Sequence, residues 1–290
     1  MRILVTGATG LVGRHVVEQL VREGVEVRAL TRDPAKAGLP PQVEVVPGDL
    51  TRPETVAPAL QGVDRMHLFP VPETAREVVG LAKEAGVRRI TVLSAAAVTI
   101  GLDTHHHPVV ERAVEESGLE WTHVRPSEFM ANLLPVWAPS IRAERVVRYP
   151  FGDDAGVPVH EADIAAVATT ALLHEGHDGA VYTLTGPEPI TTRERVRAIG
   201  EALGEEVRYE EVSRERAREL LKAQGGFAAQ NADFLLGFLD YGGDQGSGED
   251  GASEEDYSEL LRPWPGVEQA TGRPARTYAQ WARDHVEDFR

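Results

Sequence analysis

The sequence predicts an α/β fold built on a doubly wound parallel sheet, together with a smaller C-terminal substrate or cap domain. Strand-length apolar segments alternate with segments whose apolar residues recur at helical spacing through the first half of the chain. The alternation starts at the N-terminus, where the apolar run 3–5 leads into a glycine-rich turn. Such alternation is typical of parallel sheets, whose ligands bind beyond the carboxyl ends of the strands.

Three glycines follow the first strand at three-residue spacing, and the apolar face of a helix comes after them. A turn of this kind lets the backbone approach a pyrophosphate and lets the helix pack tightly on the strand. It also leaves N–H groups and the positive end of the helix dipole facing the phosphates. The alternative is a tight strand–helix turn without a ligand. We expect a dinucleotide site in a Rossmann-type domain, formed here by Gly7, Thr9, Gly10, Leu11, Val12 and Gly13.

The later segments extend the same pattern. We expect further strands near residues 25–30, 43–46, 65–69, 89–93, 121–125, 180–184 and 207–210. We expect helices near residues 51–60, 73–85, 108–117, 161–174, 192–203, 214–223 and 278–289. Prolines interrupt the pattern after residue 126. The helix at 161–174 and the strand at 180–184 are expected to return to the sheet, so the Rossmann unit is expected to be discontinuous.

The cofactor domain is predicted at residues 1–130 plus about 155–186, and the cap at about 131–154 and 187–290. Within the cap, residues 242–253 are rich in glycine and acidic residues and almost without apolar ones. That composition predicts a mobile loop, either a disordered insertion or the tip of a lid.

Composition excludes several classes of protein. The chain has 290 residues, a formal charge of -16 and no cysteine, which excludes disulfides, thiolate catalysis and cysteine-bound zinc. The negative charge argues against a nucleic-acid partner, because binding to phosphates needs a basic face. Apolar runs are too short for a membrane span or signal peptide. We expect a cytoplasmic protein, monomeric or homodimeric, whose partner is a small-molecule substrate.

The end of the second strand indicates which dinucleotide binds. An acid at this point would bond the ribose 2′-hydroxyl of NAD, whereas an arginine accommodates the 2′-phosphate of NADP. Thr31 stands where the acid would be expected and Arg32 follows it, so NADP (NADPH) is favoured. Asp33, the next residue, could bond the ribose 2′-hydroxyl, so NAD remains the less favoured alternative. The other interpretation of Asp33 is that its side chain caps the turn made with Pro34.

Several segments carry a resemblance to a known family. The TGATG sequence at residues 6–10 and the GxxGxxG spacing resemble extended and atypical short-chain dehydrogenases/reductases. Residues 111–134, ERAVEESGLEWTHVRPSEFMANLL, resemble a segment of the NmrA-like branch of that group, as do residues 159–166 and 277–289. The resemblance covers most of the chain, and it implies a Rossmann fold and an NAD(P) cofactor without defining a substrate.

The resemblance also implies cofactor contacts after the third and fourth strands. Gly48-Asp49-Leu50 is similar to the family's GDL turn, in which the acid and its neighbour lie near the adenine. The alternative is that Asp49 is an ordinary turn residue. Phe69 and Pro70 stand where the family's cofactor-facing loop lies, so they are expected to form a wall for the cofactor or simply to end the strand.

Catalysis in this superfamily usually depends on a serine after the fifth strand and on a Tyr-x-x-x-Lys pair. Ser94 stands at the serine position, but none of the six tyrosines has a lysine four residues later. The segment His107-Pro108-Val109-Val110-Glu111 stands where that motif would begin. Imidazole exchanges protons near neutral pH, so His107 could replace the tyrosine. The alternative is that the histidines at 105–107 form a polar loop; no metal site is expected from adjacent histidines.

These features lead to one functional hypothesis and two alternatives. The first hypothesis is an NAD(P)H-dependent oxidoreductase that reduces a small conjugated carbonyl or quinone-like compound, such as an intermediate of specialised metabolism. The alternatives are a non-catalytic NADP(H)-sensing regulatory protein and an epimerase of the same fold. Ser94, expected to donate a hydrogen bond to the oxyanion of the reduced substrate, and His107, expected to provide the proton, favour an enzyme, whereas the missing Tyr-x-x-x-Lys pair favours a sensor.

Overall fold

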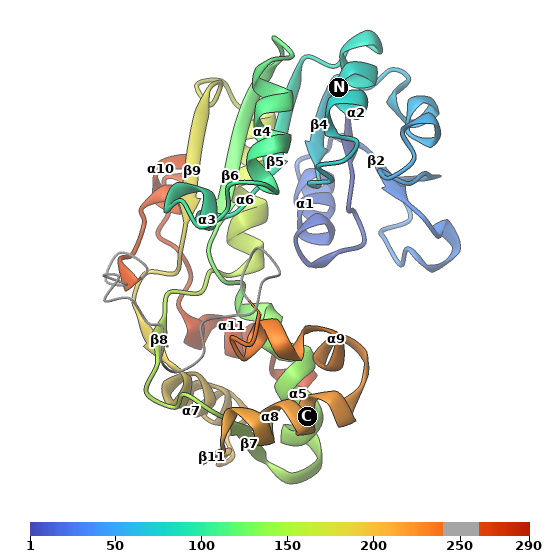
Figure 1. Ribbon diagram of the computed structural model, residues 1–290. Coiled ribbons are helices and arrows are strands. Elements are labelled where there is room, and N and C mark those ends of the chain that lie inside the picture. The colour runs from blue at the N-terminus through green and yellow to red at the C-terminus, as the bar shows by residue number, and fades with distance from the viewer. Residues whose placement is uncertain (240–260) are drawn as a thin grey trace. The chain divides into compact units, whose positions relative to one another are not determined.

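The computed structural model describes residues 1–239 and 261–290, so the predicted loop 242–253 lies outside the described residues. The chain forms two compact units, each made of three stretches of sequence (Figure 1). The first unit contains Met1–Ser127, Glu161–Leu184 and Trp264–Pro274. The second contains Glu128–His160, Thr185–Pro263 and Ala275–Arg290. The assignment of a cofactor role and a substrate role to separate domains stays a prediction.

The first unit is built on a seven-stranded sheet with the order β3-β2-β1-β4-β5-β6-β9. Every neighbouring pair in this sheet is parallel. The predicted doubly wound α/β fold is therefore confirmed. The strands are β1 (Arg2–Val5), β2 (Glu26–Thr31), β3 (Glu44–Pro47), β4 (Arg65–Leu68), β5 (Arg89–Leu93), β6 (Glu120–Pro126) and β9 (Ala180–Leu184).

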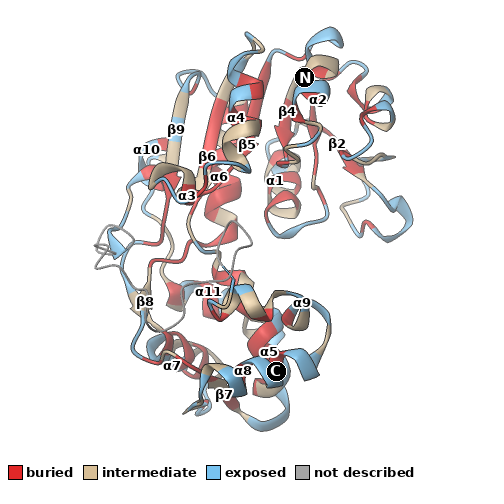
Figure 2. Cartoon of the chain, viewed as in Figure 1, coloured by how far each residue is buried: buried red, intermediate tan, exposed pale blue. Residues whose placement is uncertain are grey.

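Two pairs of helices pack on this sheet, α1 with α6 and α2 with α4. In α1 the apolar residues Val12, Val16 and Leu20 recur at helical spacing and are buried, as the sequence pattern requires. Figure 2 shows α6 buried along most of its length. The helices of this unit are α1 (Leu11–Arg22), α2 (Ala75–Glu84), α3 (Ala96–Thr99), α4 (His107–Glu115), α6 (Glu161–Leu173) and α10 (Gly266–Thr271), with a 3-10 turn at η1 (Pro34–Lys36).

The helix expected at residues 51–60 is wrong. The structure has two short 3-10 turns there instead, η2 (Pro53–Thr55) and η3 (Ala57–Leu60). Pro58 lies inside the predicted helix and has no backbone N–H. Its ring would also clash with the carbonyl group four residues earlier, so a continuous α-helix cannot form across it.

The late segment 264–274 lies with the first unit, whereas the sequence pattern placed it in the cap. Pro265 forms an antiparallel bridge with Leu184 at the end of β9. A Cβ added at Gly266 would lie 2.3 Å from the carbonyl oxygen of Thr183, so only glycine lets α10 approach β9 this closely. The sequence offered no sign of this contact because its partners are some eighty residues apart in the chain.

The second unit is mainly helical around its own core, which includes the buried rings of Trp137, Trp281 and Phe289. Its short strands pair as β7 with β11 in parallel and β8 with β10 antiparallel. The expected helix 278–289 ends early, at Asp284, and a 3-10 turn follows it. The elements are η4 (Met130–Leu133), α5 (Leu134–Glu144), β7 (Val146–Tyr149), β8 (Ala155–Gly156), β10 (Ile190–Thr191), α7 (Thr192–Leu203), β11 (Arg208–Glu211), α8 (Arg214–Gln224), α9 (Gly226–Leu235), α11 (Tyr278–Asp284) and η6 (Val286–Phe289).

Among the described residues, no helix combines the length and the apolar character that crossing a membrane requires.

Candidate active site

The turn between β1 and α1 brings the three predicted glycines together. Gly7 has a left-handed backbone, with φ of +61°, and an added Cβ would lie 3.0 Å from the Cβ of Phe69. An added Cβ at Gly13 would lie 2.1 Å from the carbonyl oxygen of Gly7, and one at Gly10 3.2 Å from the same oxygen. The turn therefore needs glycine for its backbone conformation and for the close packing of α1 on the end of β1.

The N-terminus of α1 is open to an anion. Gly10 precedes the helix in an extended conformation and provides no side-chain cap, and the first turn holds no acidic residue. The first helical hydrogen bond runs from the Arg14 amide to the Gly10 carbonyl oxygen, over 3.1 Å. The amides of Leu11, Val12 and Gly13 precede that bond and point out of the helix end. A pyrophosphate at this point would accept from these amides at the positive end of the helix dipole.

A cavity of about 340 Å³ lies beside this turn, at the carboxyl ends of β1 to β4. Seven of the predicted cofactor residues line it: Gly7, Thr9, Gly10, Arg32, Asp49, Leu50 and Phe69. Leu11, Val12 and Gly13 do not line this cavity. A ligand in the cavity would contact these three residues only through their backbone amides, at the start of α1. Pro70 is buried and does not line the cavity. Five further lining residues were not among the predicted cofactor contacts: Leu30, Thr31, Gly48, Thr51 and Val71.

Arg32 is the cation at the mouth of this cavity. It is exposed, and within residues 1–239 and 261–290 it takes part in no ion pair or side-chain hydrogen bond. Asp33 is engaged elsewhere, because its Oδ2 pairs with Nζ of Lys36 at 3.1 Å. Arg14 is engaged too, donating to the carbonyl oxygen of Gly38 over 2.8 Å. A charge for a 2′-phosphate is thus available at Arg32, whereas the nearby acid that would favour NAD is paired.

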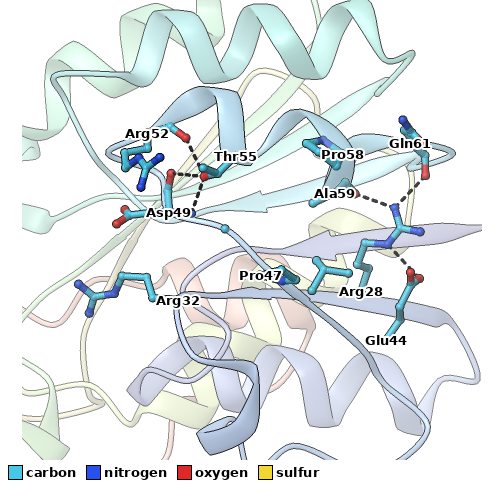
Figure 3. A pocket seen from close by; sticks show the side chains of 12 residues that line it. Arg28, Arg32, Glu44, Pro47, Asp49, Arg52, Thr55, Pro58, Ala59 and Gln61 are labelled. Atoms are coloured by element: carbon cyan, nitrogen blue, oxygen red, sulfur yellow. Dashed lines mark hydrogen bonds and ion pairs between the residues drawn. The ribbon is translucent and has the colours of Figure 1, made fainter.

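A second, larger cavity, of about 710 Å³, shares Arg32, Gly48 and Asp49 with the first, and Figure 3 shows the side chains that line it. Asp49 lies between Arg32 and Arg52 in this view. Its Oδ1 accepts from the amide and the hydroxyl of Thr51, over 2.9 and 2.8 Å. These hydrogen bonds lower the pKa of Asp49, so the carboxylate stays charged. Asp49 thus fixes its own turn while its second oxygen stays available to a ligand.

At the end of β5, Ser94 belongs to a buried ionic network. Its hydroxyl donates to Oε1 of Glu111 on α4 over 2.6 Å. Glu111 also accepts from Nε and Nη2 of Arg125 on β6, over 2.8 and 2.6 Å. Burial raises the pKa of Glu111, but the hydrogen bonds from Arg125 and Ser94 outweigh it, and the net shift is downward. Ser94 is buried and donates its one hydroxyl proton to Glu111, so the hydroxyl is not a free hydrogen-bond donor.

His107 is the first residue of α4, one helical turn before Glu111. Its Nδ1 lies 2.6 Å from Oδ2 of Asp103, a buried residue that sequence reasoning missed. The signal for Asp103 was local: an acid shortly before a helix start can accept from the backbone N–H groups of the residues that follow it, as Asp103 does from residues 105–107. Ser94 and His107 thus lie in the same unit, linked through α4.

Comparisons with known proteins identify the family to which the chain belongs. The family model described as NAD(P)H-binding matches residues 7–175, more than half of the chain. A (4-alkanoyl-5-oxo-2,5-dihydrofuran-3-yl)methyl phosphate reductase of Streptomyces griseus is 38% identical, with 99% of each chain covered. An NAD(P)H azoreductase of Xenophilus azovorans is 32% identical, again with 99% of each chain covered.

A solved structure extends the comparison. The crystal structure of an NADPH-dependent quinone oxidoreductase from Escherichia coli, in complex with NADPH, matches with a TM-score of 0.76 and 26% identity. The match covers 98% of this chain and 99% of that one. The chain therefore belongs to the family of NAD(P)H-binding Rossmann-type proteins, in agreement with its resemblance to the NmrA-like branch of the atypical short-chain dehydrogenases/reductases.

Proposed function

We propose that the protein is an NADPH-dependent reductase of a small conjugated carbonyl or quinone-like compound. The observation that carries the proposal is that Ser94, directly after β5, is hydrogen-bonded to Glu111 of α4, the helix that begins at His107, in the unit whose parallel sheet also carries the glycine turn after β1. Both β1 and β5 adjoin β4 in this sheet. A dinucleotide whose pyrophosphate lies at the β1 turn would therefore extend across the end of β4 toward Ser94 and His107.

The residues present fit NADPH. The cavity at the ends of β2 and β3 would hold the adenosine half, with the 2′-phosphate at Arg32 and the adenine near Asp49 and Leu50. The amides of Leu11 to Gly13 would hold the pyrophosphate. The adenosine half would extend from the pyrophosphate toward β2 and β3, so the nicotinamide half would extend the other way along the sheet, toward β5. When bound, NADPH would supply a hydride to the substrate.

The residues on α4 favour a conjugated substrate. An unconjugated ketone reduced by hydride leaves a strongly basic alkoxide, which demands a dedicated acid such as the family's tyrosine. Here His107 and Glu111 stand at the Tyr-x-x-x-Lys positions. A quinone or enone leaves a delocalised oxyanion of much lower basicity, which an imidazole or water can protonate. The named activities of the three relatives, on a quinone, an azo compound and an alkanoyl dihydrofuranone, support this class of substrate.

The geometry changes the role proposed for Ser94. The Ser94 hydroxyl donates its proton in a hydrogen bond to Glu111. Ser94 therefore acts as a fixed hydrogen-bond acceptor for an N–H or O–H group of the bound cofactor or substrate. Hydrogen-bond donors other than Ser94 must then stabilise the oxyanion of the reduced substrate, and His107 delivers the proton to it. A homodimer and a cytoplasmic location stay predictions from the sequence.

The test is NADPH consumption, followed by absorbance, with matched panels of quinones, enones and unconjugated ketones. We expect turnover on the first two classes and much slower turnover on ketones. Comparable rates on unconjugated ketones would show that a stronger acid than His107 serves the site. If NADPH binds tightly and no acceptor is turned over, the sensor alternative, favoured by the missing tyrosine, would replace this proposal.

A further inference from the structure

Asp103 concentrates its hydrogen bonds on the histidine segment that precedes α4. Its Oδ1 accepts from the amides of His105 and His106, over 3.1 and 2.9 Å. Its Oδ2 accepts from the amide of His107 over 3.1 Å and contacts the Nδ1 of the same residue at 2.6 Å. Only 6% of Asp103 is exposed. The carboxylate is therefore held by three backbone N–H groups and aimed at one imidazole.

This arrangement determines which nitrogen of His107 carries a proton. Burial raises the pKa of Asp103, but its hydrogen bonds with His106, His107 and His105 outweigh it and lower that pKa to about 2. An ionised carboxylate only accepts hydrogen bonds, so the Nδ1 of His107 must carry the proton that lies between them. In the neutral ring the lone pair is then on Nε2, which points away from Asp103.

The charged surroundings of His107 come from its own segment, its own helix and β6. Burial lowers the pKa of His107, and so does His106, whose ring lies 4.8 Å from that of His107. Asp103 and Glu111 act in the opposite direction, and the net pKa is below the ordinary value of 6.5. Glu111 is itself paired with Arg125 of β6, so Asp103 is the carboxylate whose charge acts on His107 most directly.

We infer that Asp103 and His107 form a carboxylate–imidazole pair in which Nε2 of His107 delivers the proton to the substrate oxygen and Asp103 is the positioning residue. This inference rests on the proposed reductase function. The substrate carbon gains the hydride of NADPH, and the π electrons of the conjugated system move to the carbonyl oxygen. That oxygen then forms a bond to the Nε2 proton of the imidazolium. His107 is left neutral, with the proton on Nδ1 still donated to the carboxylate of Asp103, NADPH is oxidised to NADP⁺ and the substrate is reduced.

The first test measures the tautomer and the pKa of the His107 imidazole directly. Long-range ¹H–¹⁵N NMR spectra of the full chain, labelled at histidine, report the tautomer and the pKa of His107, and the missing signal of His107→Gln assigns it. We expect the Nδ1–H tautomer in the wild-type protein. Asp103→Asn is the informative variant, because the amide oxygen of asparagine can still accept from the backbone N–H groups of residues 105–107 but carries no charge.

In Asp103→Asn we expect the His107 pKa to fall, because the anion that stabilises the imidazolium is gone, and the Nε2–H tautomer to become populated. If Asp103→Asn folds poorly, Asp103→Ser replaces it, because the serine hydroxyl can also accept from the backbone N–H groups. It should give the same two changes. His105→Gln is the matched control and should leave both readouts of His107 unchanged. An Nε2–H tautomer in the wild-type protein, or a His107 pKa that is unaffected by both Asp103 variants, would overturn the pair.

The second test reads the reaction, on an enone that the wild-type protein turns over. The reduction kcat should fall about ten-fold per pH unit above the pKa of His107, because the imidazolium is the donor. Asp103→Asn should move that fall to lower pH, and His107→Gln should abolish this pH dependence. Turnover with a pH profile unaffected by both variants would overturn the proton-delivery role. Absence of turnover on any acceptor, with the NMR results as expected, would instead overturn the proposed function.

Discussion

A Cβ placed on Gly13 would lie 2.1 Å from the carbonyl oxygen of Gly7, far inside any van der Waals contact. The first turn of α1 and the end of β1 therefore touch through backbone alone. Gly13→Ala should destabilise the protein by about 3 kcal/mol or more, since neither backbone segment can move aside cheaply. Gly80 of α2 is the matched control, because an added Cβ there meets open space. Gly80→Ala should be neutral or stabilise by about 1 kcal/mol in urea unfolding.

Gly10 should behave differently from Gly13. An added Cβ at Gly10 meets only the Gly7 oxygen, at 3.2 Å, so the fold should tolerate a side chain after a small adjustment. That side chain would, however, occupy the approach of a pyrophosphate to α1. We expect Gly10→Val to abolish NADPH binding in calorimetric titrations while the unfolding midpoint stays close to wild type. Normal NADPH binding by this variant would rule out the pyrophosphate position.

Arg32 should determine the preference between NADPH and NADH. A charge-assisted hydrogen bond to the 2′-phosphate contributes about 1.5–3 kcal/mol, so the wild-type protein should bind NADPH about ten-fold or more tightly than NADH. Arg32→Ala should remove most of that difference while leaving the NADH affinity nearly unchanged. Arg22→Ala, at the opposite end of α1, removes the same charge and should leave the ratio intact. Equal affinities in the wild-type protein would contradict the assignment.

Glu111 should contribute to stability in a pH-dependent way. Glu111→Gln leaves Arg125 without its charged partner, which typically costs about 3–5 kcal/mol at neutral pH. The pKa of Glu111 is lower in the folded protein than its ordinary value of 4.5. The stability it provides is therefore complete above pH 4.5 and lost as the pH falls through the folded-state pKa.

Urea unfolding at several pH values checks this expectation, because the difference between wild type and Glu111→Gln should shrink in acid. The matched control is Glu116→Gln, which breaks an exposed pair with Arg76 at the end of the same helix. That change should cost at most about 1 kcal/mol. Similar losses of unfolding free energy for Glu111→Gln and Glu116→Gln would show that the buried pair of Glu111 and Arg125 contributes no more to stability than an exposed ion pair.

The sequence was sufficient for the features that depend on local pattern. The spacing of Gly7, Gly10 and Gly13 predicted the turn, and the alternation of apolar segments predicted the parallel sheet that the structure contains. The segment 51–60 was misjudged because Thr51 and Pro53 are typical of a helix start, while Pro58 prevents the helix from continuing.

Side-chain partnerships across elements were beyond local pattern. The bond between Ser94 and Glu111 depends on how α4 lies on β5, and the pairing of Glu111 with Arg125 depends on β6 lying next to β5. No periodicity encodes these contacts, so Ser94 looked like a free proton donor. Asp103 is different: its contact with His107 is local, and the four-residue spacing could have been weighed.

The contact between Gly266 and Thr183 has a consequence for the order in which the chain becomes structured during synthesis. A ribosome releases β1 to β6 before β9, and β9 some eighty residues before α10. The sheet therefore ends at β6 until β9 is made, and β9 then stays an uncovered edge strand until α10 follows. Long-range closures of this kind slow folding and leave partly formed sheets open to association with other chains. Nascent chains stalled before residue 266 should accordingly depend on chaperones more strongly than the finished protein does.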